Sequence, residues 1–393
     1  MVAESVLATR EVSRQHAASG PAFVFEASQL QQLIAILIRR GCEVLGPVVR
    51  DGAVVYAPIE TIADLPQGWT DDQGPARYRL KQTQNGSFFG YSAAAQSWKR
   101  YLHLPDVCLW SAERQNGTFR ILNNEAPRPR AKALLGVRAC ELAAISVQDR
   151  VLLNDRYCDP IYHSRRADLF VIAVACTRAA ATCFCCSMHT GPAIGEGADL
   201  ILTELIRSGV HRFLAAAPTD RGRDLLSQLK PRQATADDIE EAEAAVSQAA
   251  SSQTRHIDTG DIRELLHQNF EHPRWDTVAA RCLTCANCTM VCPTCFCTTV
   301  EDTSDVTGRH AERWRRWDSC FTQTFSYIHG GSIRTSAKSR YRQWITHKLA
   351  AWIDQFGSSG CVGCGRCITW CPAGIDITEE VRALREGGNH GDS

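Results

Sequence analysis

Two cysteine runs decide how this sequence is read. The first is Cys282-Leu-Thr-Cys285-Ala-Asn-Cys288-Thr-Met-Val-Cys292-Pro293, and the second is Cys361-Val-Gly-Cys364-Gly-Arg-Cys367-Ile-Thr-Trp-Cys371-Pro372. Both have the spacing C-x2-C-x2-C-x3-C-P, which holds a [4Fe–4S] cubane. Three thiolates at two-residue gaps let a short loop wrap three corners of the cube, with backbone N–H groups directed at its sulfurs. The sequence therefore predicts two [4Fe–4S] clusters.

The fourth cysteine of each run is predicted to cross over. In two-cluster ferredoxins this residue ligates the cluster of the other run. The first cluster is therefore assigned to Cys282, Cys285, Cys288 and Cys371, and the second to Cys361, Cys364, Cys367 and Cys292. Crossed ligation places two clusters close together, as single-electron transfer requires.

The remaining cysteine content favours metal binding over disulfides. The chain has 19 cysteines, an odd number, and Met1-Val2-Ala3-Glu4 does not begin a basic region followed by an apolar run. We therefore expect no export signal and a cytoplasmic location, where thiols stay reduced. A structural zinc site is the alternative, but such sites use separated cysteine pairs more often than three evenly spaced thiols.

Composition excludes two classes of partner. Lys plus Arg and Asp plus Glu both number 43 in 393 residues, so the net charge is zero. A general nucleic-acid binder carries a basic excess, and none is expected here. The longest apolar stretch, 169–176, is far shorter than the ~20 residues of a membrane span, so we expect no membrane span.

The predicted fold class is α+β, in two domains. Residues 1–272 are read as a mixed α/β domain, and residues 273–393 as an α-helical ferredoxin-like domain that carries both clusters. The boundary is placed at His272-Pro273, just before the first run. Apolar residues at three- and four-residue steps predict a helix over 341–356 that ends at Gly357.

Local patterns predict further elements in the first domain. Apolar spacing predicts a helix over 30–38, and Asp51-Gly52 is typical of a hairpin turn. The run 169–175 is a buried-strand pattern, and the acidic, Ala-rich stretch 236–250 is read as a helix.

A third iron–sulfur cluster is a hypothesis for the first domain. Its candidate ligands are Cys140, Cys176, Cys183 and Cys185, with Glu141 as an oxygen ligand or a neighbouring group. The spacing matches no standard motif, so ordinary buried thiols remain the alternative. Three more cysteines, Cys295, Cys297 and Cys320, stay unassigned, and Cys42, Cys108 and Cys158 are read as structural.

The sequence gives no sign of catalysis by the chain alone. No G-x-G-x-x-G follows a strand, so neither a flavin nor a nicotinamide site is supported. No catalytic residue is assigned. The stretch 309–348 is locally basic, which favours a docking face for an acidic partner or a charge screen around anionic clusters.

The chain resembles a known family over nearly its whole length, the β subunits of cytosolic NiFe hydrogenases of the sulfhydrogenase type. The related A subunit of anaerobic sulfite reductase shares the resemblance. The carrying segments are Gly136-Val-Arg-Ala-Cys140-Glu, Asp168-Leu-Phe-Val-Ile-Ala-Val, Thr182-Cys-Phe-Cys185-Cys-Ser-Met, Trp317-Asp-Ser-Cys320-Phe, Ser339-Arg-Tyr-Arg-Gln-Trp344 and the second cysteine run. It departs from the family pattern at Ala139-Cys140-Glu141, where Pro-Cys-Asp is usual, and at Cys186, where a small residue is usual.

The resemblance implies an electron-transfer subunit. Its partners would be a flavoprotein subunit that binds FAD and meets NAD(P)H, and the small and large subunits of a NiFe hydrogenase. The same relay in an anaerobic sulfite reductase is the second hypothesis. A non-redox module with structural metal is the third.

Overall fold

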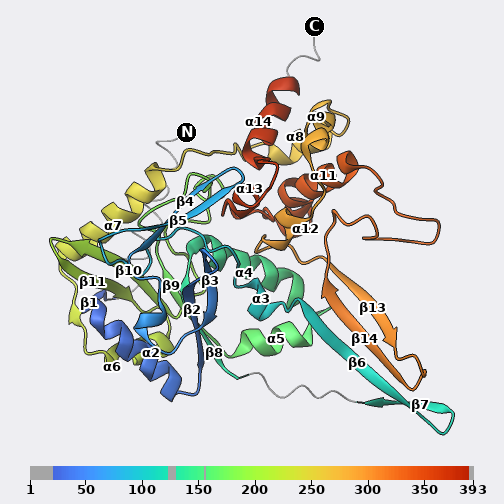
Figure 1. The fold of residues 1–393 in the computed structure, drawn as a ribbon. Coiled ribbons are helices and arrows are strands. Elements are labelled where there is room, and N and C mark those ends of the chain that lie inside the picture. The colour runs from blue at the N-terminus through green and yellow to red at the C-terminus, as the bar shows by residue number, and fades with distance from the viewer. Residues whose placement is uncertain (1–20, 123–129, 155, 389–393) are drawn as a thin grey trace.

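The computed structural model describes residues 21–122, 130–154 and 156–388 (Figure 1). Residues 1–20, on which the expectation of no export signal rests, lie outside these ranges. In the described part of the chain, no helix is both long and apolar enough to cross a bilayer.

The main sheet has eight strands and is parallel at its centre. Neighbouring pairs β10/β9, β9/β8 and β8/β2 are parallel, and the outer pairs are antiparallel. Strand β9 is buried along its whole length, which confirms the strand predicted over 169–175. In spatial order the strands are β12 (Arg232–Gln233), β1 (Phe23–Glu26), β11 (Val210–Ala216), β10 (Leu200–Arg207), β9 (Leu169–Val174), β8 (Lys132–Val137), β2 (Glu43–Arg50) and β3 (Ala53–Pro58).

Helices from the first part of the chain pack on this sheet (Figure 1). The predicted helices over 30–38 and 236–250 are confirmed as α2 and α7, and the hairpin predicted at Asp51-Gly52 joins β2 to β3. Helix α4 directly follows β8, so its first turn lies at the carboxyl edge of the parallel strands, where ligand sites form in α/β sheets. The helices are α2 (Leu30–Arg39), α3 (Lys99–Leu102), α4 (Ala139–Leu152), α5 (Pro160–Ala167), α6 (Asp220–Gln228) and α7 (Ala236–Ser251).

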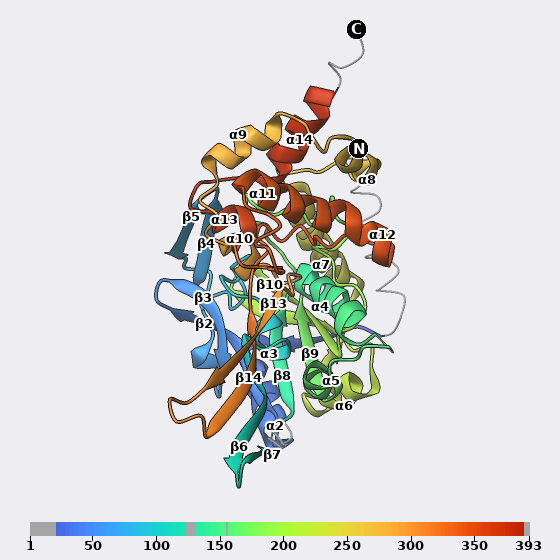
Figure 2. The same cartoon turned by 90° about the vertical axis from the view of Figure 1, so that its right-hand side faces the viewer.

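The last third of the chain adds a group of helices above that edge of the sheet (Figures 1 and 2). Helix α11 continues through a π-helical turn at His347–Ala351 into α12, and Gly357 ends it with a φ of 68°, as the sequence predicts for 341–356. The group comprises α8 (Ile262–Gln268), α9 (Arg274–Arg281), α10 (Asn287–Met290), α11 (Ala337–Thr346), α12 (Trp352–Phe356), α13 (Arg366–Thr369) and α14 (Ile377–Gly388).

The segment 273–393 is not purely helical, in contrast to the prediction. Strands β13 (Thr298–Ser304) and β14 (His310–Trp317) form a hairpin, because their β-branched and aromatic residues favour strands over helix. Strand β14 pairs with β6 (Asp106–Gln115), which pairs with β7 (Thr118–Leu122), and this sheet projects as an arm (Figures 1 and 2). The boundary at 272/273 stays a prediction, and this sheet crosses it.

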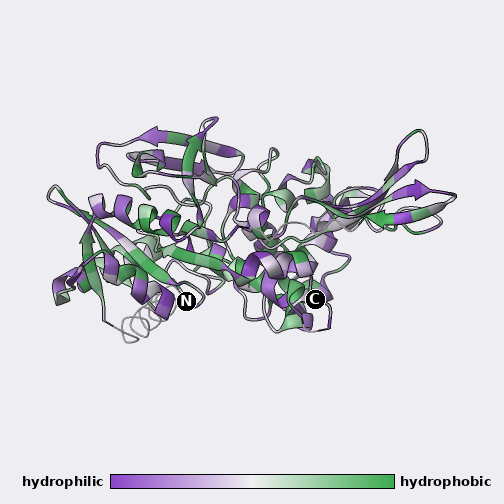
Figure 3. Ribbon diagram, turned by 90° about the horizontal axis from the view of Figure 1, so that it is seen from below, coloured by the Kyte–Doolittle hydropathy of each residue, from purple (hydrophilic) through white to green (hydrophobic). Residues whose placement is uncertain are grey.

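Packing also joins the two parts of the chain. One apolar core lies on the main sheet, and long green, hydrophobic strands are visible in Figure 3. A second core combines Phe184 and Leu266 with Trp275, Trp344 and Ile368. A small sheet of β4 (Trp69–Gly74) and β5 (Arg77–Gln82) lies beside α13. The cysteine runs are thereby held against the first part of the chain.

Candidate iron–sulfur sites

The two cysteine runs adopt the same backbone conformation. The third residue of each run has a positive φ, 50° at Thr284 and 62° at Gly363. So does the fifth, 67° at Ala286 and 75° at Gly365, after which the short helices α10 and α13 begin. Left-handed residues at these points wrap each loop around the space between its thiols.

Backbone N–H groups point at the first sulfur of each run. The N–H of Gly363 donates to the Sγ of Cys361 over 3.5 Å, and Thr284 donates likewise to Cys282. Such bonds favour the thiolate over the thiol. Burial acts in the opposite direction and dominates, raising the pKa of Cys361 to about 12.

The first thiol group, Cys282, Cys285, Cys288 and Cys371, lines one cavity. Aromatic side chains of Phe321, Tyr341 and Trp344 form part of its wall. Burial raises the pKa of Cys288, and the charges of the other three thiols raise it further. The structure therefore brings together the four residues that the crossed assignment gives to one cluster.

The second thiol group, Cys361, Cys364, Cys367 and Cys292, is more deeply buried. Burial has the largest effect in raising the pKa of Cys367, and the charges of the other three thiols raise it further. Cys292 and Cys364 are both 9% exposed, whereas Cys285 of the first group is exposed. Here too the fourth thiol comes from the other run.

A buried lysine faces the second thiol group. The Nζ of Lys348 donates to the Sγ of Cys292 over 3.1 Å and to the hydroxyl of Thr294 over 2.8 Å. Burial works to lower the pKa of Lys348, yet the surrounding thiolates raise it well above its ordinary value. Sequence reasoning missed this residue, although a lysine on the apolar face of the 341–356 helix was a usable signal.

The third thiol group, Cys140, Cys176, Cys183 and Cys185, lines a separate cavity. The amide of Gln253 donates to the Sγ of Cys185 over 3.1 Å. Arg138, 1% exposed, lines the same cavity. Burial raises the pKa of Cys183 to about 12, and the charge of Cys176 adds to it. The structure thus gathers the four candidate ligands of the hypothetical third cluster.

The third thiol group packs directly on the second cysteine run. The N–H of Phe184 donates to the carbonyl of Gly363 over 2.9 Å. A Cβ on Gly363 would lie 2.6 Å from the backbone of Phe184, and one on Gly365 would lie 2.3 Å from the carbonyl oxygen of Thr182. Glycine is required at both positions, because the 182–185 loop packs closely on the run and because the backbone φ is positive. The first run carries Thr284 and Ala286 at the same positions, both with positive φ.

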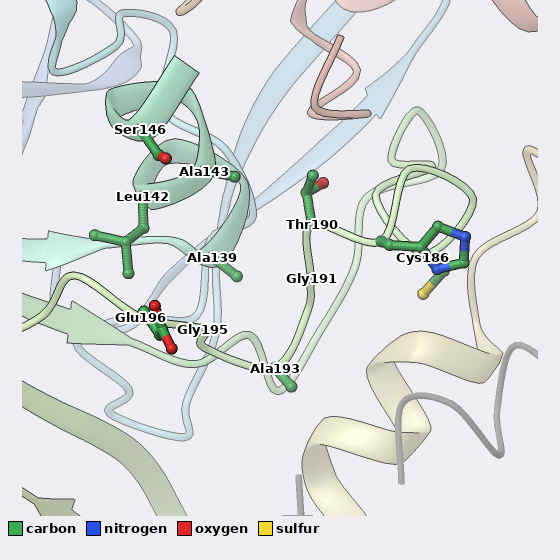
Figure 4. Close-up of a pocket in the computed structure, with 11 residues that line it drawn as sticks. Ala139, Leu142, Ala143, Ser146, Cys186, Thr190, Gly191, Ala193, Gly195 and Glu196 are labelled. Atoms are coloured by element: carbon green, nitrogen blue, oxygen red, sulfur yellow. The ribbon is translucent and has the colours of Figure 1, made fainter. Parts of the chain in front are cut away.

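Two neighbours of the third group lie outside its cavity. Glu141 accepts from Tyr56 over 2.8 Å and from Trp98 over 3.1 Å and pairs with Arg366, so its oxygens are engaged elsewhere. This gives it the role of a neighbouring group rather than an oxygen ligand. Cys186 faces a different, open pocket, drawn in Figure 4, which the start of α4 and the loop 189–196 line on its other sides.

The other cysteines separate into two sets. Cys295, Cys297 and Cys320 lie together beside Cys292, where hydrogen bonds link Cys292 to Cys295 and Cys297 to Cys320. Away from these groups are Cys42 between α2 and β2, Cys108 in β6 and Cys158 before α5.

The three thiol groups fit iron–sulfur clusters by donor chemistry. Thiolate is the ligand that such clusters use, and each group supplies four. Two buried cations, Lys348 and Arg138, lie beside them, and a buried charge requires a partner of opposite sign. The sulfurs surround space rather than converge: within the described ranges, no three His, Cys, Asp or Glu side chains could hold a single metal ion.

Comparison with known proteins supports iron–sulfur clusters in this chain. Residues 281–375 match the family described as 4Fe-4S dicluster domain, a span that includes both runs. Sulfhydrogenase 2 subunit beta of Pyrococcus furiosus is 30% identical over 285 residues, which cover 70% of this chain and 80% of that protein. The chain belongs to the sulfhydrogenase β-subunit family. It is an iron–sulfur, electron-transfer subunit of the hydrogenase type, as the sequence resemblance implied.

Membership in the sulfhydrogenase β-subunit family supports the hypothesis of a hydrogenase-type electron-transfer subunit. The matched dicluster segment supports iron–sulfur clusters in the last third of the chain. The third thiol group, at residues 140–185, lies before that segment, so a third cluster is supported only by the cavity that its four thiols line.

Proposed function

We propose that this chain relays single electrons through three [4Fe–4S] clusters. One terminal partner is a flavoprotein subunit that exchanges electrons with NAD(P)H, and the other is the small and large subunit pair of a NiFe hydrogenase. The crossed ligand sets are the first and second thiol groups, and the third thiol group holds the third cluster. The chain itself performs no bond chemistry on the terminal substrates.

The observation that carries the proposal is that the second thiol group lies next to both of the others. Cys140 and Cys183 of the third group are close enough to Cys364 of the second for its charge to act on their pKa values. Cys367 of the second group is similarly influenced by Cys288 of the first. The second group is therefore the middle member of a row.

The two ends of the row lie near the surface. At the first group, Cys285 is exposed and the adjacent Leu283 is 66% exposed. At the third group, the open pocket of Figure 4 lies on the far side of Ala139 and Gly191, next to the exposed His189. An exposed cysteine at the first group and an open pocket beside the buried third group suit a relay between two docked partners.

The chain's own residues would set the redox properties. When bound, the clusters supply reversible one-electron chemistry over a range of about −700 to +450 mV. Lys348 and Arg138 place positive charge beside the thiol groups, and Gln253 donates a hydrogen bond to sulfur. Both kinds of contact stabilise the more negative, reduced state.

The test is anaerobic isolation of the tagged chain with its native partners. We expect about twelve irons per chain, and EPR of the reduced sample should show three interacting [4Fe–4S] signals. Cys176→Ser should lose about four of these irons, whereas Cys158→Ser, at an exposed thiol outside the groups, should lose none. Both NAD(P)H and hydrogen should reduce the clusters.

Three results would count against the proposal. About eight irons in the unaltered chain would remove the third cluster. Clusters that resist reduction by NAD(P)H and hydrogen in the complex would remove the relay. Sirohaem absorption in the isolated complex would favour a sulfite reductase instead of a hydrogenase.

A further inference from the structure

Three cysteines that the relay does not use lie between its first and second thiol groups. Cys295 and Cys297 follow the first run, and Cys320 follows β14. At the base of the β13–β14 hairpin, the N–H of Asp318 donates to the carbonyl of Cys297 over 2.9 Å. The hairpin therefore fixes the loop of Cys320 against the loop of Cys297.

Cys297 and Cys320 form a hydrogen-bonded pair of sulfurs. The thiol of Cys320 donates to Cys297, which lowers the pKa of Cys297 to about 7 and raises that of Cys320. The ammonium groups of Lys348 and Lys99 also lower the pKa of Cys297. A thiolate beside a thiol is the arrangement from which disulfides form.

Two buried cations, Lys99 and Lys348, occupy this region. Lys99 is 5% exposed; its Nζ donates to the carbonyl of Cys295 over 3.0 Å and lies 3.9 Å from the ring centroid of Trp317. Among the described residues, neither Lys99 nor Lys348 is ion-paired with a carboxylate. Their charge favours sulfur in its anionic form.

We propose that Cys297 and Cys320 are a redox-active dithiol that exchanges electrons with the adjoining iron–sulfur centres. The inference rests on the proposed relay, which supplies those centres. In oxidation, the Cys320 thiol loses its proton, an S–S bond forms between it and the Cys297 thiolate, and two electrons leave one at a time to one-electron iron–sulfur acceptors. Reduction reverses each change. Both residues are partly exposed, so the protons can exchange with solvent.

The position of the pair suits this exchange. The charge of Cys288, in the first thiol group, acts on Cys320. On the other side, Cys295 separates Cys297 from Cys292 of the second group and is hydrogen-bonded to Cys292. The pair therefore has a sulfur ligand of the first group near Cys320, and Cys295 connects it to a sulfur ligand of the second group. On reduction, the disulfide would accept two electrons, one from each of two one-electron iron–sulfur centres.

A fourth cluster fits these residues less well. The usual ligand set of a cubane is four cysteines, and Cys292 already belongs to the second thiol group. Only Cys295, Cys297 and Cys320 remain, one thiol short of a set. A dithiol needs two sulfurs in contact, which Cys297 and Cys320 provide.

The experiment counts electrons and thiols in the cluster-loaded chain under anaerobic conditions. The protein is oxidised with thionine, titrated with dithionite, and alkylated at each end point before peptide mass spectrometry. The variants are Cys297→Ser and Cys320→Ser, and Cys158→Ser is the matched control at an exposed cysteine. Iron content and EPR are recorded for every sample.

We expect the oxidised chain to yield a disulfide-linked peptide pair containing residues 297 and 320, and the reduced chain to yield two alkylated thiols. Cys297→Ser and Cys320→Ser should each take up two electrons fewer than the unaltered chain, with unchanged iron. Equal electron counts would overturn the dithiol, and loss of iron in either variant would make these residues cluster ligands. A failure of the relay itself would be seen in a different measurement, because the clusters in the complex would then not be reduced by NAD(P)H or hydrogen.

Discussion

Glu141 and Arg366 form a buried ion pair that links two of the thiol groups. Their Oε1 and Nη2 atoms lie 2.5 Å apart, and both side chains are 1% exposed. Glu141 directly follows Cys140 of the third group, and Arg366 directly precedes Cys367 of the second. The pair therefore fixes the start of α4 against the second cysteine run.

Removing one charge of this pair should be costly. Glu141→Gln leaves the Arg366 guanidinium buried and uncompensated, and breaking such a pair costs about 3–5 kcal/mol of unfolding free energy. Denaturant unfolding of the cluster-loaded chain would measure the loss. Asp302→Asn, at the exposed Arg313–Asp302 pair, is the control and should cost less than about 1 kcal/mol.

The double variant Glu141→Gln/Arg366→Met gives a sharper test. Because it removes both charges, it should be more stable than Glu141→Gln alone. A double variant that is no more stable would show that the hydrogen bonds of Glu141 to Tyr56 and Trp98, rather than its charge, carry the effect.

A second prediction compares equivalent glycine and non-glycine positions of the two runs. Gly365→Ala would place its Cβ 2.3 Å from the carbonyl oxygen of Thr182, at a φ of 75°. We expect displacement of the 182–185 loop and loss of about four irons from the third cluster. Ala286→Gly, at the matching position of the first run, should leave the iron content unchanged. Equal iron in both variants would contradict the prediction.

The sequence predicts much of this architecture because its signals are local. The spacing of each run specifies which three thiols lie on one loop. The periodicity of apolar residues predicts α2, α7, β9 and the long helix that ends at Gly357. The crossed grouping of Cys292 and Cys371 can also be predicted, because in two-cluster ferredoxins the fourth cysteine of each run ligates the cluster of the other run.

The remaining features depend on contacts distant in sequence. Cys140 and Cys183 share a cavity because α4 and the loop after β9 meet at one edge of the sheet, which no short motif encodes. The pairing of β6 with β14 joins residues about 200 positions apart and explains why the prediction of an α-helical second domain did not include this sheet. Lys348 was visible only as a charge on an otherwise apolar helix face.

Lys348 should tune the second cluster. Its ammonium donates to Cys292, and positive charge stabilises the more negative, reduced state. Lys348→Met should therefore lower the midpoint potential by about 60 mV or more, the one-electron equivalent of ~1.4 kcal/mol. Lys338→Met, at a partly exposed pair with Asp276, is the control on the same long helix. Redox titration followed by EPR distinguishes the two, and equal shifts would exclude a specific role.

His103 should make the chain sensitive to acid. It is 2% exposed, and neither ring nitrogen has a hydrogen-bond partner among the described residues. Burial, aided by the charges of Arg315 and Lys99, lowers its pKa from 6.5 to about 4. Since the unfolded chain binds this proton more readily, stability is lost as the pH falls from about 6.5 towards 4.

His103→Phe should reduce that loss, because phenylalanine can keep the stacking on Trp317 without a titrating group. Thermal unfolding at pH 7.5 and pH 5, followed under anaerobic conditions, compares the drop in Tm with that of the unaltered chain. The control is His163→Phe, at an exposed position in α5, which should keep the full drop. If His103→Phe and the unaltered chain lose the same Tm between the two pH values, the acid response originates elsewhere, for instance at the cluster ligands.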